Sequence, residues 1–180
     1  MPRDDYLALP DADLLAQCDV HVYKASGPGG QHRNKVSSAV RLVHRPTQLA
    51  ATANDSRSQH DNKARALRRL RRRLACSLRQ PLNLADVSIP PVVSECLFRP
   101  RGQAAGQAAL RLRVGPKDAR FWAVAAFLLD LLEAAEGRLA DAAALAGITT
   151  SNLATVFQSE RHLLAATQEI RKRFGRRPLA

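Results

Sequence analysis

The stretch Ser26-Gly27-Pro28-Gly29-Gly30-Gln31-His32-Arg33-Asn34-Lys35 decides how the first part of this chain is organised. Three glycines and a proline in four consecutive positions exclude a helix or a strand interior, because glycine disfavours both and proline fixes its own φ. The stretch is therefore a loop, and basic side chains follow its glutamine. Such a loop can bring its backbone very close to a polyanion, so the pattern suggests a tip aimed at nucleic acid.

The segments around this loop predict strands and then a helix. Residues 18–25 alternate apolar and polar side chains, as a half-buried strand does. Residues 39–45 and 49–53 are predicted to form two further strands, joined by a tight turn at 45–48. The polar stretch 54–63 then leads into a strongly basic helix. The alternative for the glycine loop is an ordinary turn between two strands.

At this point the sequence resembles the catalytic domain of peptide chain release factors and of their shortened ribosome-rescue relatives. The resemblance runs from about His21 to Leu74 and rests on two motifs at the family's spacing, Ser26–Lys35 and Ser56–Ala64. The expected fold class is α+β, with a short antiparallel sheet and a long basic helix. An all-α segment resembling a helix-turn-helix is expected to follow.

The resemblance implies a reaction, the hydrolysis of the ester that joins peptide to tRNA in the peptidyl transferase centre of the ribosome. This reaction needs an activated water and a hydrogen-bond donor for the oxyanion. In the family, the backbone amide of the motif glutamine is that donor, and the role carries over to Gln31, with Gly29 and Gly30 as the other catalytic positions. No cofactor and no metal is expected, and the chain offers no convincing Ser-His-Asp or Cys-His set.

Polar and basic residues around both motifs are expected to contact large-subunit ribosomal RNA or the tRNA end. They are His32, Arg33, Asn34, Lys35, Arg57, Gln59, Lys63, Arg65, Arg68, Arg69, Arg72 and Arg73. Between Ser56 and Arg79 the chain has nine basic residues and the single acid Asp61. These cations repel one another unless a polyanion is near, which favours RNA over a merely solvated face.

The second motif is also expected to brace the base of the glycine loop. The residues expected to do so are Arg57, Ser58, Gln59, His60, Asn62 and Lys63.

We predict three parts along the chain: a catalytic domain with an N-terminal arm at 1–79, a proline-punctuated linker with room for a short hairpin at 80–115, and a helical segment at 116–180. The arm is predicted to hold a helix that starts near Pro10. The helical segment is predicted to open with a helix that begins at Gly115-Pro116 and ends at Gly137.

The pattern at 139–158 has the spacing of a helix-turn-helix, with Gly147 in the turn. The alternative is any αα-hairpin, which also favours alanine and glycine. Its second helix is polar but not basic, which makes base readout doubtful. A basic, tail-like end follows at 171–177.

Composition limits the partners and the compartment. Lys and Arg number 28 against 16 Asp and Glu, so the formal charge of +12 favours phosphate-rich partners over membranes. Aromatic residues make up 4% of the chain, which argues against an aromatic-lined stacking platform. The three cysteines are widely spaced, so neither a disulfide framework nor a zinc site is expected. We expect a reducing, cytoplasmic location, with neither signal peptide nor membrane span.

Together these features predict a codon-independent peptidyl-tRNA hydrolase that acts on stalled ribosomes, with the ribosome and peptidyl-tRNA as partners. Nothing in the sequence matches the codon-recognition tripeptide of the stop-reading factors. The alternative is a non-enzymatic protein that binds ribosomal RNA. A third and weaker hypothesis is a DNA-binding regulator built on residues 139–158.

Overall fold

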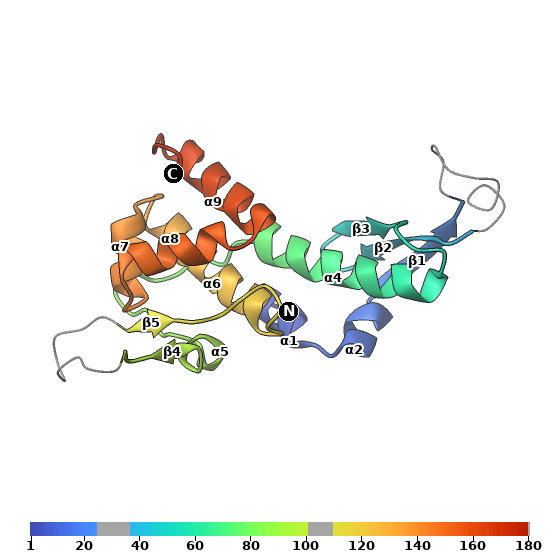
Figure 1. Ribbon diagram of the computed structural model, residues 1–180, viewed down its shortest axis with the longest axis horizontal. Helices are drawn as coiled ribbons and strands as arrows, with labels where there is room; N and C mark the ends of the chain where they lie inside the picture. Colours follow the sequence, from blue (N-terminus) through green and yellow to red (C-terminus); the bar gives the residue numbers. More distant parts are fainter. Residues whose placement is uncertain (25–36, 101–109, 180) are drawn as a thin grey trace. The chain divides into compact units, whose positions relative to one another are not determined.

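The computed structural model of the protein describes residues 1–24, 37–100 and 110–179. The chain divides into two compact units, Met1–Leu74 and Ala75–Ala180 (Figure 1). The first unit combines a small antiparallel sheet with helices, and the second is mostly helical. The predicted α+β class is confirmed.

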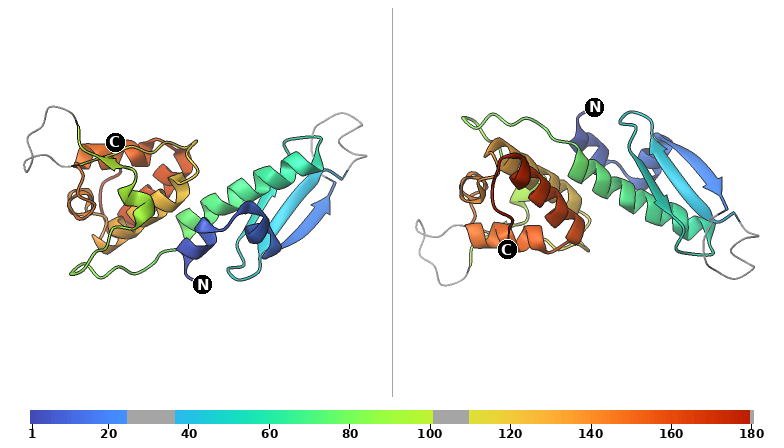
Figure 2. Two further views of the ribbon diagram at one scale, coloured as in Figure 1. Left: turned by 90° about the horizontal axis from the view of Figure 1, so that it is seen from below. Right: turned by 90° about the horizontal axis from the view of Figure 1, so that it is seen from above.

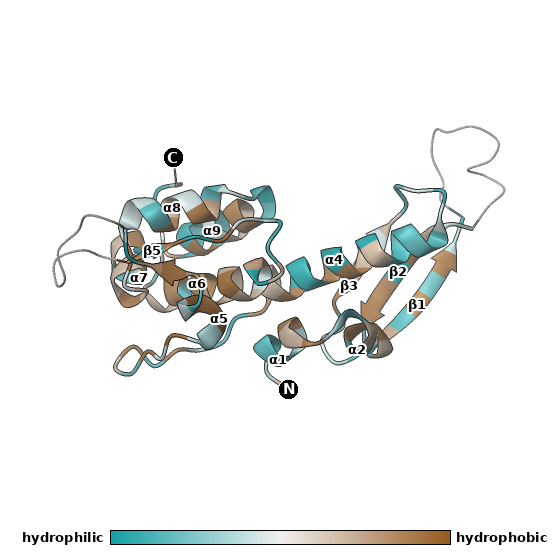
Figure 3. Cartoon of the chain, turned by 60° about the horizontal axis from the view of Figure 1, so that its bottom comes forward, coloured by the Kyte–Doolittle hydropathy of each residue, from teal (hydrophilic) through white to brown (hydrophobic). Residues whose placement is uncertain are grey.

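The sheet of the first unit has three antiparallel strands in the order of the chain. They are β1 (Cys18–Tyr23), β2 (Ala39–His44) and β3 (Ala50–Ala53). All three were expected from the sequence, and each is one or two residues shorter than the pattern suggests. β1 alternates hydrophilic and hydrophobic residues along its length, which is the signal that predicted it (Figure 3).

The long basic helix α4 (Gln59–Ser77) lies along one face of this sheet (Figure 2). Its apolar residues recur every three or four positions, so they form one stripe that can be removed from water. Leu67, Leu70 and Leu74 of this stripe are buried, as are Val40 and Leu42 of β2. Burying a leucine side chain contributes roughly 1.5–3 kcal/mol, so this stripe is a main source of the unit's stability.

The N-terminal arm forms two short helices, α1 (Arg3–Ala8) and α2 (Asp11–Ala16). The start of α2 after Pro10 agrees with the sequence, whereas α1 was not predicted. Arg71 of α4 holds the arm: its guanidinium donates to the carbonyls of Leu7 (2.9 Å) and Leu9 (2.6 Å) at the end of α1. Helix ends leave carbonyls without intrahelical partners, and a guanidinium satisfies two of them here.

In the second unit, helices pack around a largely apolar core. The helices and strands of this unit are α5 (Pro91–Ser94), β4 (Leu97–Phe98), β5 (Arg111–Leu112), α6 (Phe121–Ala134), α7 (Leu139–Leu145), α8 (Thr150–Gln158) and α9 (Arg161–Arg173). α6 is the most hydrophobic of the helices and is buried along nearly its whole length (Figure 3). The predicted buried helix is therefore present.

The predicted start of α6 at Gly115-Pro116 is wrong. The backbone turns first, with Asp118 N donating to Gly115 O at 2.9 Å, and the helix begins at Phe121. The Asp118 side chain accepts from the backbone N–H of Arg120 at 2.9 Å, which stabilises this turn in place of a first helical turn.

The helical pair expected at 139–158 is present as α7 and α8. Gly147 adopts a φ of +68° in the turn between them, a left-handed conformation that favours glycine. Thr149 caps α8, and its hydroxyl accepts from Asn152 N at 3.2 Å. Leu153 and Val156 are buried, as their spacing indicates.

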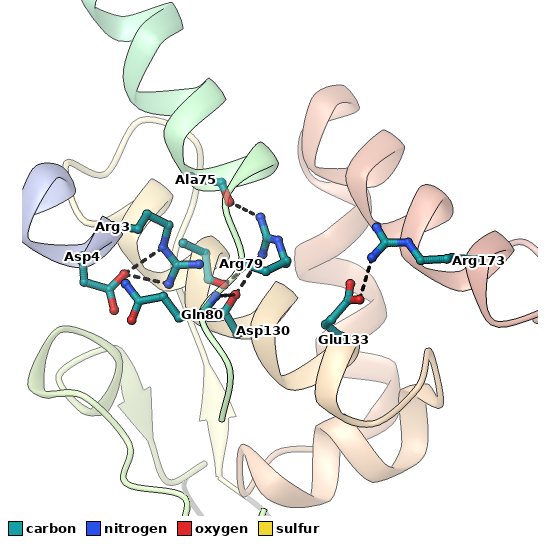
Figure 4. A network of polar contacts seen from close by, with 9 residues as sticks. Arg3, Asp4, Ala75, Arg79, Gln80, Asp130, Glu133 and Arg173 are labelled. Atoms are coloured by element: carbon teal, nitrogen blue, oxygen red, sulfur yellow. Dashed lines mark hydrogen bonds and ion pairs between the residues drawn. The ribbon is translucent and has the colours of Figure 1, made fainter. Parts of the chain in front are cut away.

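A buried carboxylate anchors the start of the second unit to α6 (Figure 4). Asp130 is 1% exposed and accepts from Arg79 Nη1 at 3.2 Å and from Gln80 N at 3.1 Å. Arg79 also donates to the carbonyl of Ala75 at 2.5 Å. A buried charge is tolerated only when it is paired and hydrogen-bonded in this way.

The basic C-terminal end is not the tail that the sequence suggested. Gly175, with a φ of +65°, reverses the chain after α9. Arg171 then donates to the carbonyl of Arg177 at 2.8 Å and to that of Gly137 at 2.7 Å. The amide of Gln168 pairs with the backbone of Leu179, so this end folds back onto its own helix.

Candidate active site

The glycine loop itself lies outside the described residues. This holds for Gly29, Gly30 and Gln31, and also for His32, Arg33, Asn34 and Lys35. The structure does describe the two strands that the loop connects. Tyr23 at the end of β1 pairs with Ala39 at the start of β2, so residues 25–36 connect adjacent ends of neighbouring antiparallel strands.

Asn62 of the second motif holds the base of this loop. Its side chain is fully buried and donates from Nδ2 to the carbonyls of Ser38 and Ser56, both at 2.7 Å. Its Oδ1 accepts from Ser56 N at 2.9 Å. One amide thus ties together the end of the loop, the start of the second motif and the first turn of α4. This is the bracing role expected for Asn62 from the sequence.

Serines of the second motif define where α4 begins. Ser58 Oγ accepts from Asp61 N at 3.1 Å, and Ser56 Oγ donates to the Asp61 carboxylate at 3.1 Å. This arrangement is a capping box, which satisfies N–H groups that the helix leaves unpaired. The negative charge of Asp61 in the first turn also interacts favourably with the helix dipole.

Two of the arginines expected to contact RNA bind the edge of the sheet instead. Arg69 donates to the carbonyl of Thr52 at 2.6 Å, and Arg73 donates to that of Ala50 at 2.5 Å. Alternate carbonyls of an edge strand point away from the sheet, two residues or about 6.7 Å apart. Four residues of a helix rise about 6 Å, so arginines at this spacing match those carbonyls.

Arg69 also forms an ion pair with Asp55, with Nη2 and Oδ2 2.8 Å apart. The hydrogen bond from Arg69 holds the pKa of the Asp55 carboxyl below its ordinary value. Asp55 therefore stays ionised at neutral pH and helps to fix the Arg69 side chain at the sheet edge.

Other residues of the expected set present side chains to solvent. Arg65 and Arg68 are exposed on the side of α4 away from its leucine stripe, and Arg57 and Gln59 are exposed just before and at the start of the helix. Lys63 and Arg72 are half-buried. We call Arg65 and Arg68 the outward pair, because no printed contact within the described ranges occupies their guanidinium groups.

Sequence reasoning missed the buried histidine of β2. His44 is fully buried, with Nε2 3.1 Å from Gln17 Oε1 and Nδ1 2.7 Å from Thr47 Oγ1. Tyr6 packs edge-on against the ring, with centroids 4.7 Å apart. Burial, and secondly the charge of Arg45, lowers the pKa of His44. A neutral imidazole therefore joins the N-terminal arm to the β2–β3 turn, and only its alternating position in β2 hinted at this.

A fold of this kind, with a glycine loop between β1 and β2 and a capped basic helix behind them, defines a known domain class. Residues 11–85 match the family model described as the RF-1 domain. The first unit of this chain therefore carries an RF-1 domain, as its motifs indicated.

Curated relatives agree with this assignment over the same part of the chain. Peptide chain release factor 1 of Leptothrix cholodnii is 55% identical over 73 residues, which cover 41% of this chain and 20% of the relative. Peptide chain release factor 1 of Verminephrobacter eiseniae is 56% identical over 77 residues, with the same two shares. That of Novosphingobium aromaticivorans is 48% identical over 73 residues, again 41% and 20%. The chain thus spans about a fifth of the length of these relatives.

Two searches of the described residues have negative results. No helix there combines the length and the hydropathy needed to cross a bilayer. No group of three or more His, Cys, Asp or Glu side chains in the same ranges is arranged to hold a metal ion.

Proposed function

We propose that this chain hydrolyses the ester of peptidyl-tRNA on the ribosome, and that it does so without reading a codon. The observation that carries the proposal is the RF-1 domain at residues 11–85, with Gly29-Gly30-Gln31 inside it. About half the residues of this domain are identical to those of peptide chain release factors. A helical unit follows the domain directly.

In the proposed reaction, water adds to the carbonyl carbon of the ester and the bond to the tRNA oxygen breaks. A proton passes to that oxygen, and the peptide leaves as a carboxylic acid. The backbone N–H of Gln31 donates to the oxyanion that forms on the way. One such donor contributes roughly 3–4 kcal/mol of transition-state stabilisation in other enzymes. Glycines beside it leave the approach free of side chains.

The surroundings of the loop support this role. A donor works only when it is held in position before the reaction. Asn62 binds the backbone on either side of the second motif and at Ser38, directly after the loop region. The outward pair adds positive charge on α4, where ribosomal RNA of the large subunit is the proposed partner.

Substitutions in the loop test the proposal. On ribosomes stalled without a stop codon and carrying labelled peptidyl-tRNA, Gly30→Ala should abolish peptide release and Gln31→Ala should weaken it. Co-sedimentation with ribosomes should be largely unchanged for both variants, which separates catalysis from binding. Release by Gly30→Ala at the parent rate would refute the proposal.

The codon-independent part has its own comparison. Release from ribosomes with an empty messenger channel should equal or exceed release from ribosomes that display a stop codon. A strict need for a stop codon would contradict this part alone.

The outward pair supports a second candidate function, a non-enzymatic protein that binds ribosomal RNA. In that case the protein would co-sediment with free large subunits and release no peptide from any stalled complex.

A further inference from the structure

The second unit presents a small hairpin with two different faces. β4 and β5 pair in antiparallel register, Leu97 opposite Leu112 and Phe98 opposite Arg111 (Figure 1). Leu112 is buried, and Leu97 packs against the core of the unit. Since side chains alternate between the faces of a strand, Phe98 and Arg111 lie on the outer face, and both are exposed.

Arg113 extends this outer face. It follows Arg111 by two residues, is exposed, and its backbone N–H donates to Cys96 O at 2.9 Å, which continues the pairing. We call Phe98, Arg111 and Arg113 the hairpin face. Phe98 is 41% exposed, which is unusual for a residue of its size.

The charge of the hairpin face is not balanced by neighbours in sequence. From Phe98 to Arg113 there is no acidic residue. The nearest acids are Glu95 and Asp118, and both pair with Arg120, at 3.6 Å and 2.8 Å. Within the described residues, no ion pair engages Arg111 or Arg113. The face therefore presents two guanidinium groups beside one aromatic ring.

The hairpin is fixed from behind, so the face is held in a defined position. Asn152 of α8 clamps Leu112: its Oδ1 accepts from Leu112 N at 2.7 Å and its Nδ2 donates to Leu112 O at 3.1 Å. Leu110 N donates to Gly147 O at 3.0 Å in the turn between α7 and α8. A surface ordered in advance loses less conformational entropy when it binds a partner.

We propose that the hairpin face binds single-stranded RNA. Guanidinium groups match phosphates with two parallel hydrogen bonds, and an exposed ring can stack on a base only if that base is unpaired. The low aromatic content excludes a broad platform, and a single ring between arginines suits one stacked base with its flanking phosphates. The choice of RNA over other polyanions rests on the proposed ribosomal function of the first unit.

Fluorescence anisotropy of a labelled single-stranded RNA, measured with the full chain across salt concentrations, tests this proposal. The variant Arg111→Ala/Arg113→Ala should weaken binding and reduce the slope of log affinity against log salt by about 1.4, or 0.7 for each phosphate contact. Phe98→Ala should weaken binding about tenfold, and Phe98→Tyr should restore it. The matched control is Lys172→Ala/Arg177→Ala, which removes two exposed charges elsewhere in the same unit.

Equal losses in the hairpin variant and its control would overturn the proposal, because they would show only the effect of net charge. Unchanged RNA affinity in the hairpin variant, together with lost sedimentation on phosphatidylserine vesicles, would assign the face to a membrane instead. Gly30→Ala should bind the RNA normally. Failure of peptide release with intact hairpin-dependent binding would therefore reject the proposed function and leave this inference standing.

Discussion

Asn62 shows how one buried side chain can support a loop that it does not belong to. All three of its printed hydrogen bonds go to backbone groups, at Ser38 and Ser56. Replacing it leaves these groups without partners in a place that water does not reach. Each orphaned group costs roughly 1–3 kcal/mol, more than the bond itself contributes net.

Asn62→Ala should therefore destabilise the first unit by about 3 kcal/mol and reduce peptide release. Unfolding in urea can be followed by fluorine NMR of fluorotyrosine, because both tyrosines, Tyr6 and Tyr23, lie in this unit. Gln59→Ala is the control: its exposed side chain should change stability by less than about 0.5 kcal/mol. Parent-like stability of Asn62→Ala would show that the loop base is held in another way.

The arginines of α4 separate into groups that the helix alone does not reveal. Arg69 and Arg73 satisfy carbonyls at the open edge of β3, and Arg71 satisfies carbonyls at the end of α1. Arg65 and Arg68 instead remain exposed. An edge strand with unpaired carbonyls is prone to pair with other chains, so the first group also protects the sheet.

Two double variants of equal charge test this division. Arg69→Ala/Arg73→Ala should speed amide hydrogen exchange in residues 50–53 and lower the free energy of unfolding of the first unit. Arg65→Ala/Arg68→Ala should leave both unchanged within about 0.5 kcal/mol. It should weaken ribosome binding instead, with a salt dependence reduced by about 0.7–0.9 for each phosphate contact. The division would be wrong if both variants lost stability to the same extent.

The first unit as a whole should lose stability in mild acid because of His44. Its pKa is lower in the folded protein than the ordinary value of 6.5, mainly through burial. The unfolded chain then binds more protons than the folded one between these two values. The free energy of unfolding is therefore full above about pH 6.5 and declines as the pH falls towards the folded pKa.

Urea unfolding of the first unit between pH 7.5 and pH 5 measures this decline. His44→Phe should lower stability at pH 7.5, because Gln17 and Thr47 lose their partner, and should flatten the pH dependence. His60→Gln is the control, since its side chain is exposed. A parent-like pH slope in His44→Phe would assign the decline to other groups.

Local sequence patterns were enough to predict the strands, the basic helix and the RF-1 motifs. Alternation in β1, the leucine spacing of α4 and the glycines of residues 26–30 each act over a few neighbouring residues, so they are legible in the chain itself. The buried character of α6 followed in the same way from its unbroken apolar run.

Other features depended on contacts between residues far apart in the chain. Whether an arginine of α4 meets solvent or the carbonyls of β3 depends on which strand lies beside it, and no local pattern records that. The same holds for the clamp of Asn152 on Leu112 and for the return of the basic C-terminal end onto α9. Sequence determined the secondary structure and the family, because both follow from short-range periodicity and motifs. Tertiary structure alone decided which polar groups are already satisfied within the protein and which are exposed for a partner.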